Sequence, residues 1–192
     1  MDGLTHEGVK FESLDYADKA LIGYEFVKCT FVNCNFSKCN LKNTDFIDCS
    51  FNVCNFSMAA LDNTGLKNAV FTHCKLMGVN FSHSNNFLFF VSFQNCNLDY
   101  ASFFKKKLKK TVFNGCTLKD TDFEEADLSM AVFKDCDLQD AHFIRSVLEK
   151  TDFRTASNYT IDPEVNKMKN ARFSYMGLAG LLAKYQIDID YD

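Results

Sequence analysis

The stretch Cys29–Asn40, CTFVNCNFSKCN, places a cysteine at every fifth position and a large apolar residue two positions after a cysteine. An amphipathic helix repeats its apolar residues every three and four positions, and a half-buried strand repeats them every two. A spacing of five fits neither element. The stretch therefore indicates a five-residue piece of backbone that turns at each repeat.

This five-residue period fills most of the 192-residue chain. From Phe11 to Phe81, and again from Phe93 to Phe153, every fifth residue is Phe, Leu or Tyr. The position two residues earlier is mostly small, and it holds all nine cysteines, while the other three positions are mostly polar. Each unit thus offers one large and one small side chain to an interior. A square coil with one unit per side and four units per turn would satisfy this pattern.

The cysteines are expected to be reduced core residues. The amino terminus, MDGLTHEGVK, lacks the basic start and apolar run of a secretory signal, so nothing points to an oxidising compartment. Cysteines one turn apart would lie about 4.8 Å apart with parallel side chains, whereas a disulfide needs β-carbons about 3.8 Å apart on converging bonds. Zinc sites usually place cysteines two to four residues apart, a spacing that is absent. Cysteine therefore serves as a small buried hydrophobe.

The units CNFSK, TDFID, CNLDY, ADLSM and CDLQD resemble the motif of the pentapeptide repeat family. The resemblance covers about Phe11 to Phe153. It implies an all-β fold, a right-handed quadrilateral parallel β-helix, here with a short C-terminal α-helix. We expect one domain over residues 1–192, with an irregular N-terminal cap at 1–25, regular coils at 26–153 with a break at 82–92, and a C-terminal capping and dimerisation segment at 154–192.

The break in the period carries three phenylalanines. In SHSNNFLFFV, Ser82–Val91, the residues Phe87, Phe89 and Phe90 no longer follow the spacing of five. A bulge or loop is expected there, with two extra residues if the cysteine columns on its two sides are to align. The rings either fold back over the coil or form an exposed apolar patch for a partner.

A run of lysines follows the break. In FFKKKLKK, Phe103–Lys110, Lys106 occupies a small inward position. Burying an unpaired ammonium is expensive, so we expect the backbone to bulge or Lys106 to turn outward. Its neighbours Lys105, Lys107, Lys109 and Lys110 form a basic patch, either a solvated face or a site for an acidic partner surface.

Acidic residues gather after the lysines, and together with the phenylalanines of the break they form the candidate partner surface. The acids are Asp120, Asp122, Glu124, Glu125, Asp127, Asp135, Asp137 and Asp140. The whole chain has a net charge of −4 at pH 7, so this acidity is local.

The C-terminal segment departs from the repeat. Met168 and Phe173 look like a last pair of repeat centres, and Leu178, Leu181, Leu182 and Tyr185 have the spacing of an amphipathic helix. This helix is expected to cover the final coil and also to bind the same helix of a second subunit. Ile187 and Ile189, which alternate with Asp188 and Asp190, predict a short strand.

The ending NYTIDPEVNKMKNARFS followed by GLLAKYQIDI resembles the bacterial pentapeptide repeat proteins that protect DNA gyrase and topoisomerase IV, a group that includes quinolone-resistance, albicidin-resistance and microcin-immunity proteins. The resemblance implies a homodimer through the C-terminal helix, and a rod that imitates duplex DNA and binds gyrase. The alternative is a general interaction scaffold that binds an unknown partner. Duplex DNA carries one charge per about 1.7 Å, so imitation by a subunit of net charge −4 must rely on shape and an acidic face.

No catalytic motif is recognisable, and we expect no enzyme activity, no cofactor and no metal. The four histidines have no evident nucleophile beside them, and neither a nucleophile elbow nor a phosphate loop is present. No apolar run approaches the roughly 20 residues of a membrane-spanning helix. We therefore expect a cytoplasmic protein that binds other proteins, without a membrane and without direct contact to nucleic acid.

Overall fold

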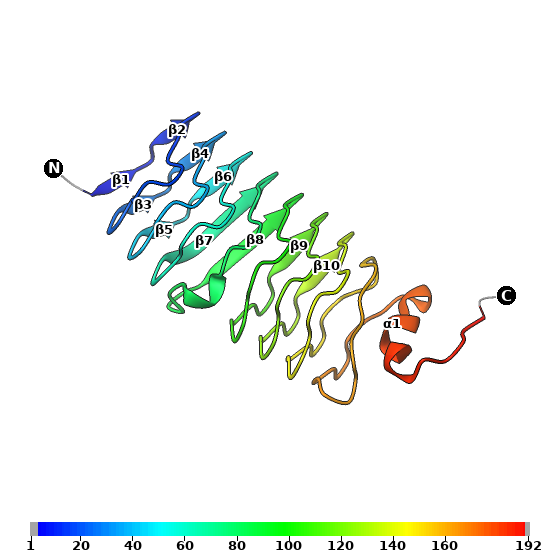
Figure 1. The fold of residues 1–192 in the computed structure, drawn as a ribbon. Coiled ribbons are helices and arrows are strands. Elements are labelled where there is room, and N and C mark those ends of the chain that lie inside the picture. The colour runs from blue at the N-terminus through cyan, green and yellow to red at the C-terminus, as the bar shows by residue number, and fades with distance from the viewer. Residues whose placement is uncertain (1–3, 191–192) are drawn as a thin grey trace.

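The chain forms a rod of stacked coils that ends in a short helical segment (Figure 1). The computed structural model describes residues 4–190. The strands are β1 Thr5–Glu7, β2 Lys10–Glu12, β3 Glu25–Val27, β4 Thr30–Val32, β5 Asp45–Ile47, β6 Ser50–Asn52, β7 Gly65–Thr72, β8 Phe90–Gln94, β9 Val112–Asn114 and β10 Val132–Lys134. The helices are η1 Phe81–His83, η2 Tyr175–Gly177, α1 Ala179–Leu182 and η3 Ala183–Tyr185, of which only α1 is α-helical.

All of the strands pair in parallel, one coil onto the next. Phe31 of β4 lies beside Phe51 of β6, and Phe93 of β8 lies beside Phe113 of β9, so one coil takes twenty residues. Between β7 and β8 the partner of Phe71 is Phe93, an offset of 22 residues. The two extra residues expected in the break are therefore present, and the twenty-residue register resumes after them.

The four-sided section follows from a turn at every fifth residue. The backbone has a positive φ at these corners, for example 53° at Lys38, 58° at Asn43 and 53° at Asp48. This left-handed conformation is uncommon outside glycine, although Asn and Asp tolerate it best. Polar residues at the corner positions thus suit both the solvent and the backbone.

The core is a set of aromatic and aliphatic columns along the axis of the rod. On one side the column runs through Phe31, Phe51, Phe71, Phe93, Phe113, Phe133, Phe153 and Phe173, with successive ring centroids 4.8 to 5.4 Å apart. Neighbouring columns meet edge to face, as Phe93 and Phe103 do at 6.0 Å. Offset-stacked and edge-to-face contacts are the favourable geometries of aromatic rings.

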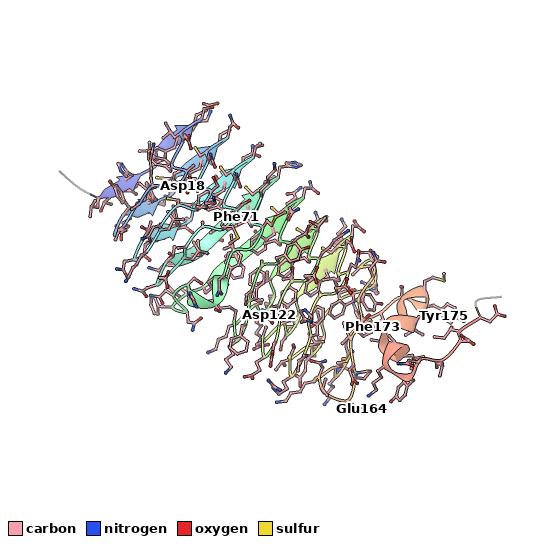
Figure 2. The ribbon with its side chains drawn as sticks, viewed as in Figure 1. Asp18, Phe71, Asp122, Glu164, Phe173 and Tyr175 are labelled. Carbon is pink, nitrogen blue, oxygen red and sulfur yellow. The ribbon has the colours of Figure 1, made fainter. Side chains whose placement is uncertain are left out.

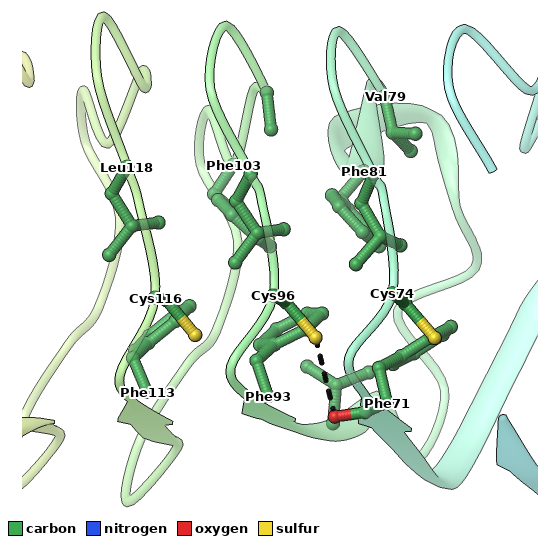
Figure 3. Packing of buried hydrophobic residues seen from close by; sticks show 14 of the residues in the cluster. Phe71, Cys74, Val79, Phe81, Phe93, Cys96, Phe103, Phe113, Cys116 and Leu118 are labelled. Atoms are coloured by element: carbon green, nitrogen blue, oxygen red, sulfur yellow. Dashed lines mark hydrogen bonds between the residues drawn. The ribbon is translucent and has the colours of Figure 1, made fainter. Parts of the chain in front are cut away.

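The small inward position is filled as the sequence predicts. All nine cysteines are buried and free, and Figure 3 shows Cys74, Cys96 and Cys116 in one column beside their phenylalanines. Cys96 donates to the backbone oxygen of Phe71 in the preceding coil at 3.4 Å. Thr64 donates in the same way to Leu41, at 2.8 Å. The position therefore takes small side chains that are apolar or can reach this carbonyl.

The first coil is regular in its backbone, which differs from the irregular cap expected at residues 1–25. Strands β1 and β2 pair with β3 and β4 at the usual offset of twenty. The departure lies in the side chains: Val9 and Leu14 are exposed at the small position, and the ring of His6 stacks on Phe26 at 5.3 Å. The coil thus keeps its hydrogen bonds while its interior lies open at the end of the rod.

At the other end, Met168 and Phe173 pack against the core as the expected last repeat centres. The predicted strand at Ile187–Asp190 is wrong, since this segment forms neither strand nor helix. A strand needs a neighbouring strand to complete its hydrogen bonds, and no described strand pairs with this one. None of the described helices is long and apolar enough to cross a membrane.

Candidate interaction surfaces

Lys106 lies inside the rod, so the expectation that it turns outward is wrong. Its side chain is 1% exposed, and its ammonium donates to the backbone oxygen of Ser84 and to Oδ1 of Asn86, each at 2.8 Å. The ammonium also lies 4.2 Å from the ring centroid of Phe89. These contacts offset the desolvation that makes an unpaired buried charge costly. Burial lowers the pKa of Lys106 to about 8.

Of the three phenylalanines in the break, one folds back over the coil and two are exposed. Phe89 is half-buried and packs against the core, over the ammonium of Lys106. Phe87 and Phe90 point outward and are 67% and 48% exposed, and Leu88 between them is 65% exposed. The break is therefore a loop that is fixed to the core on one side and apolar on the other.

The basic patch lies on the coil that follows this loop. Lys107, Lys109 and Lys110 are exposed, and within residues 4–190 no carboxylate forms an ion pair with any of them. Lys105 differs, because its ammonium lies 3.4 Å from a carboxylate oxygen of Glu125. Three of the four predicted lysines thus present free positive charge.

The predicted acids do not form one strip. Asp120 and Asp140 occupy the same corner of successive coils, with φ of 51° and 56°, and Asp122 lies on the adjacent side of the rod, where it accepts from Ser102 at 2.9 Å. We call Asp120, Asp122 and Asp140 the acidic edge; Figure 2 labels Asp122, on the long side of the rod.

The other acids are separated or neutralised. Arg145 donates to both Glu124 and Glu125, and its hydrogen bond lowers the pKa of Glu125. Asp137 pairs with Lys119 at 3.3 Å. Asp127 lies one coil after Lys107, beside it but without an ion pair, and Asp135 occupies a different corner from Asp120. Sequence spacing alone could not separate these residues, because their side of the rod depends on the position within each coil.

The C-terminal segment presents an apolar surface of a different composition from the one expected. Leu181 packs against the core, whereas Leu178, Leu182 and Tyr185 are exposed. Tyr175 and Met176, which the spacing of an amphipathic helix does not include, are 75% and 68% exposed and belong to the same surface. Figure 2 places Tyr175 beyond Phe173, at the end of the rod. The available signal was two large apolar residues directly after the last repeat centre.

Polar contacts and a close backbone approach fix this segment on the rod. Lys184 bridges Asp162 and Glu164 at 2.8 and 2.6 Å, and the hydroxyl of Tyr185 donates to Glu164 at 2.7 Å. These hydrogen bonds hold the pKa of Glu164 below its usual range. A β-carbon built on Gly180 would overlap the backbone oxygen of Tyr159, so only glycine fits there.

The side chains that most often carry chemistry in proteins are dispersed or enclosed in the part of the chain that the structure describes. Among residues 4–190 no three His, Cys, Asp or Glu side chains come together in a way that could hold a metal ion. The nine thiols are enclosed, and burial raises the pKa of Cys39 to about 11 and that of Cys49 to about 12. Neutral buried thiols are inert packing groups.

Two family models match the chain in adjoining parts. A model described as a pentapeptide repeat region matches residues 86–159, and one described as pentapeptide repeats, in eight copies, matches residues 29–66 and 54–85. The chain belongs to the pentapeptide repeat family. Among curated proteins, nothing matches this pentapeptide repeat protein.

Solved structures resemble this pentapeptide repeat protein over nearly its whole length. A trypsin-treated variant of QnrB1, a plasmid-mediated fluoroquinolone resistance protein, is 19% identical with a TM-score of 0.63, and the match covers 98% of this chain and 99% of QnrB1. A second trypsin-treated variant is 18% identical with a TM-score of 0.50, covering 97% and 99%. HetL, from the cyanobacterium Nostoc, is 17% identical with a TM-score of 0.41, covering 89% and 90%. At these identities the first two matches establish the shared fold.

Proposed function

We propose that this protein binds a type II DNA topoisomerase, DNA gyrase or topoisomerase IV, and protects it from an inhibitor or toxin. The observation that supports this proposal best is the full-length similarity to QnrB1, whose described role is fluoroquinolone resistance. The C-terminal ending, which resembles the topoisomerase-protecting group, points in the same direction.

The acidic edge is the proposed contact with the enzyme. Asp120 and Asp140 repeat at one corner of successive coils, about 4.8 Å apart, and Asp122 adds a carboxylate beside them. A surface that accepts DNA is rich in positive charge. Since the chain has a net charge of only −4, the rod shape and this edge carry the imitation.

The proposed active form is a homodimer through the C-terminal segment. Tyr175, Met176, Leu178 and Leu182 expose apolar surface at the end of the rod, where a second copy would cover it. Leu178→Asp and Leu182→Asp should give monomers by light scattering, because a charge would enter the interface. Leu181→Asp is a poorer test, since Leu181 packs against the core of its own chain.

A supercoiling assay tests the proposal. Purified protein is added to DNA gyrase with and without a quinolone, and the wild type is compared with a variant that combines Asp120→Asn, Asp122→Asn and Asp140→Asn. The matched control combines Glu12→Gln, Asp48→Asn and Glu149→Gln, which removes the same charge from exposed positions elsewhere. We expect the wild type and the control to inhibit supercoiling or to rescue it from the quinolone, and the acidic-edge variant to lose both effects. Failure of the wild type with both gyrase and topoisomerase IV would overturn the proposal.

A further inference from the structure

One side of the rod presents exposed apolar side chains next to unpaired lysines. We call Phe87, Leu88, Phe90, Lys107, Lys109 and Lys110 the aromatic–lysine patch. Single exposed apolar residues are ordinary on protein surfaces, but three of the four residues at 87–90 are exposed here. The patch is therefore a candidate for a binding surface.

The apolar part of the patch is held in place by the interior. Beneath it, Lys106 donates to Ser84 and Asn86 and lies under the ring of Phe89. At its start, the backbone of Phe87 donates to Oδ1 of Asn85 at 2.8 Å. The same Asn85 donates to Asn63 of the preceding coil at 3.0 Å. The loop thus has a fixed base from which Phe87 and Leu88 project.

The lysines continue this surface along the rod. The basic coil stacks directly on the loop, because Lys106 reaches back to Ser84 and Asn86 and because Phe113, three residues after Lys110, lies beside Phe93, three residues after Phe90. The exposed Val70 lies beside Ser92, and the exposed Val112 directly precedes Phe113, the partner of Phe93. The loop and the basic coil therefore form one surface, lined by apolar groups and cations.

We infer that the aromatic–lysine patch binds an acidic protein segment that also carries apolar side chains. The carboxylates of such a segment would meet Lys107, Lys109 and Lys110, and its apolar side chains would cover Phe87, Leu88 and Phe90. A basic DNA-binding surface would be repelled by these lysines, so the inferred partner differs from the one proposed for the acidic edge. This inference stands whether or not the protein binds a topoisomerase.

The few lysines of the patch and the negative charge on the rest of the rod favour a short acidic segment over a nucleic acid or an anionic membrane. Lys110 and Asp120 lie ten residues apart, half a coil, and so occupy opposite edges of the rod. Three lysines provide few phosphate contacts for a nucleic acid, and the net charge of −4 opposes a long polyanion. An anionic membrane is a broad surface and would also meet Asp127 and Glu149 on later coils of the same side, whereas a short segment can lie over the loop and the lysine coil alone.

Fluorescence anisotropy tests this inference with three probes on the full-length protein. The first is a synthetic peptide in which glutamate alternates with leucine and phenylalanine, with a glutamine version as its control. The second is oligo(dT), and the third is a phosphatidylserine vesicle. The patch variants are Lys107→Glu, Lys109→Glu and Lys110→Glu combined, and Phe87→Ser, Leu88→Ser and Phe90→Ser combined. The matched control reverses three exposed lysines elsewhere, Lys38, Lys42 and Lys75, to glutamate.

We expect the glutamate peptide to bind the wild type and the control equally, and each patch variant about tenfold more weakly, since several exposed ion pairs or apolar contacts add to that factor. The glutamine peptide should bind the wild type about as weakly as the glutamate peptide binds the lysine variant. Thermal melting checks that each variant is folded. Equal binding of the peptide to all variants, no binding to the wild type, or patch-dependent binding of oligo(dT) or vesicles in place of the peptide would overturn the inference.

Discussion

The ammonium nitrogen of Lys106 lies 4.2 Å from the ring centroid of Phe89, inside a rod whose other inward positions are small or apolar. The same nitrogen donates to Ser84 and Asn86. One buried cation therefore contacts three residues of the loop that interrupts the repeat. The loop replaces the water around the ammonium with two neutral oxygens and the face of a ring.

Lys106→Met should loosen the loop without unfolding the rod. Methionine keeps the length and apolar stem of lysine but leaves the oxygens of Ser84 and Asn86 without their donor. Each lost hydrogen bond to a charged group costs about 1.5–3 kcal/mol, and the removed desolvation of the ammonium offsets much of this. Chymotrypsin should therefore cut at Phe87–Phe90 several-fold faster than in the wild type, while the melting temperature changes little. Lys107→Met is the matched control, and equal cleavage of both variants would contradict the role given to Lys106.

The stability of the protein should gain from Lys106 as the pH rises above 8. The folded pKa is about 8, and the pKa of an unfolded lysine is about 10.4. Between these values the unfolded chain holds a proton that the folded chain has released, so the free energy of unfolding rises with pH. Urea unfolding of the wild type and Lys106→Met at pH 7 to 10 measures this. The free energy of unfolding of the wild type should rise relative to that of Lys106→Met by roughly 3 kcal/mol across the window. A constant difference would show that the folded pKa is not lowered.

The cysteines should resist alkylation until the rod unfolds. All nine are buried, and burial raises the pKa of Cys39 to about 11 and of Cys49 to about 12, so thiolate is scarce at pH 8. Mass spectrometry after iodoacetamide treatment should find unmodified native protein and nine modified cysteines in urea. Rapid modification of any cysteine in the native protein would disagree with the packing described.

Phe113→Ala should destabilise the rod strongly. Its ring is fully buried and stacks on Phe93 and Phe133, at 5.3 and 4.8 Å. Deleting a buried phenylalanine ring typically costs about 3–5 kcal/mol. Phe87→Ala, at an exposed position, should cost less than about 0.5 kcal/mol. Urea unfolding of the two variants checks this contrast, and similar losses would argue against the assignment of inward and outward rings.

Gly180→Ala should detach the C-terminal segment from the last coil. The added β-carbon would overlap the backbone oxygen of Tyr159, and overpacking of this kind costs about 1–3 kcal/mol. Trypsin cleavage after Lys184 should become faster, while the rod keeps its melting temperature. Gly8→Ala gives the control for a glycine replacement at the far end of the rod, because its β-carbon would meet no atom within 4 Å and its cost comes only from the positive φ of 66°. Unchanged cleavage in Gly180→Ala would show that this contact does not position the segment.

Most of the fold follows from the sequence because the period of five is a strong physical constraint. The residue type at two of every five positions decides which side chains enter the core, and the offset of 22 at the break follows from aligning Cys74 with Cys96. The cysteines are predictable as core residues for the same reason, since all nine occupy one position of the repeat. The repeat therefore predicts the core side chains and the register of the coils, because both recur with the same period.

The surfaces were predicted less well, because they depend on departures from the rule. Lys106 violates the rule for inward positions, and its burial becomes reasonable only with the oxygens of the loop in place. The recurrence of Thr44, Thr64 and Ser84 at twenty-residue intervals was a usable signal, since it shows in the sequence that this column takes polar side chains, and the structure buries all three. The eight acids do not form one surface, because residues that are close in the sequence lie on different sides of the four-sided coil.

The offset of 22 at the break has a consequence for how such a chain tolerates change in length. Because each coil bonds only to its two neighbours, residues added at a corner can leave the wall as a loop while every later coil keeps its place in the stack. Insertions at corners should then survive random mutagenesis more often than insertions within a side. The corners are the places where this architecture can acquire new attachments without rebuilding its interior.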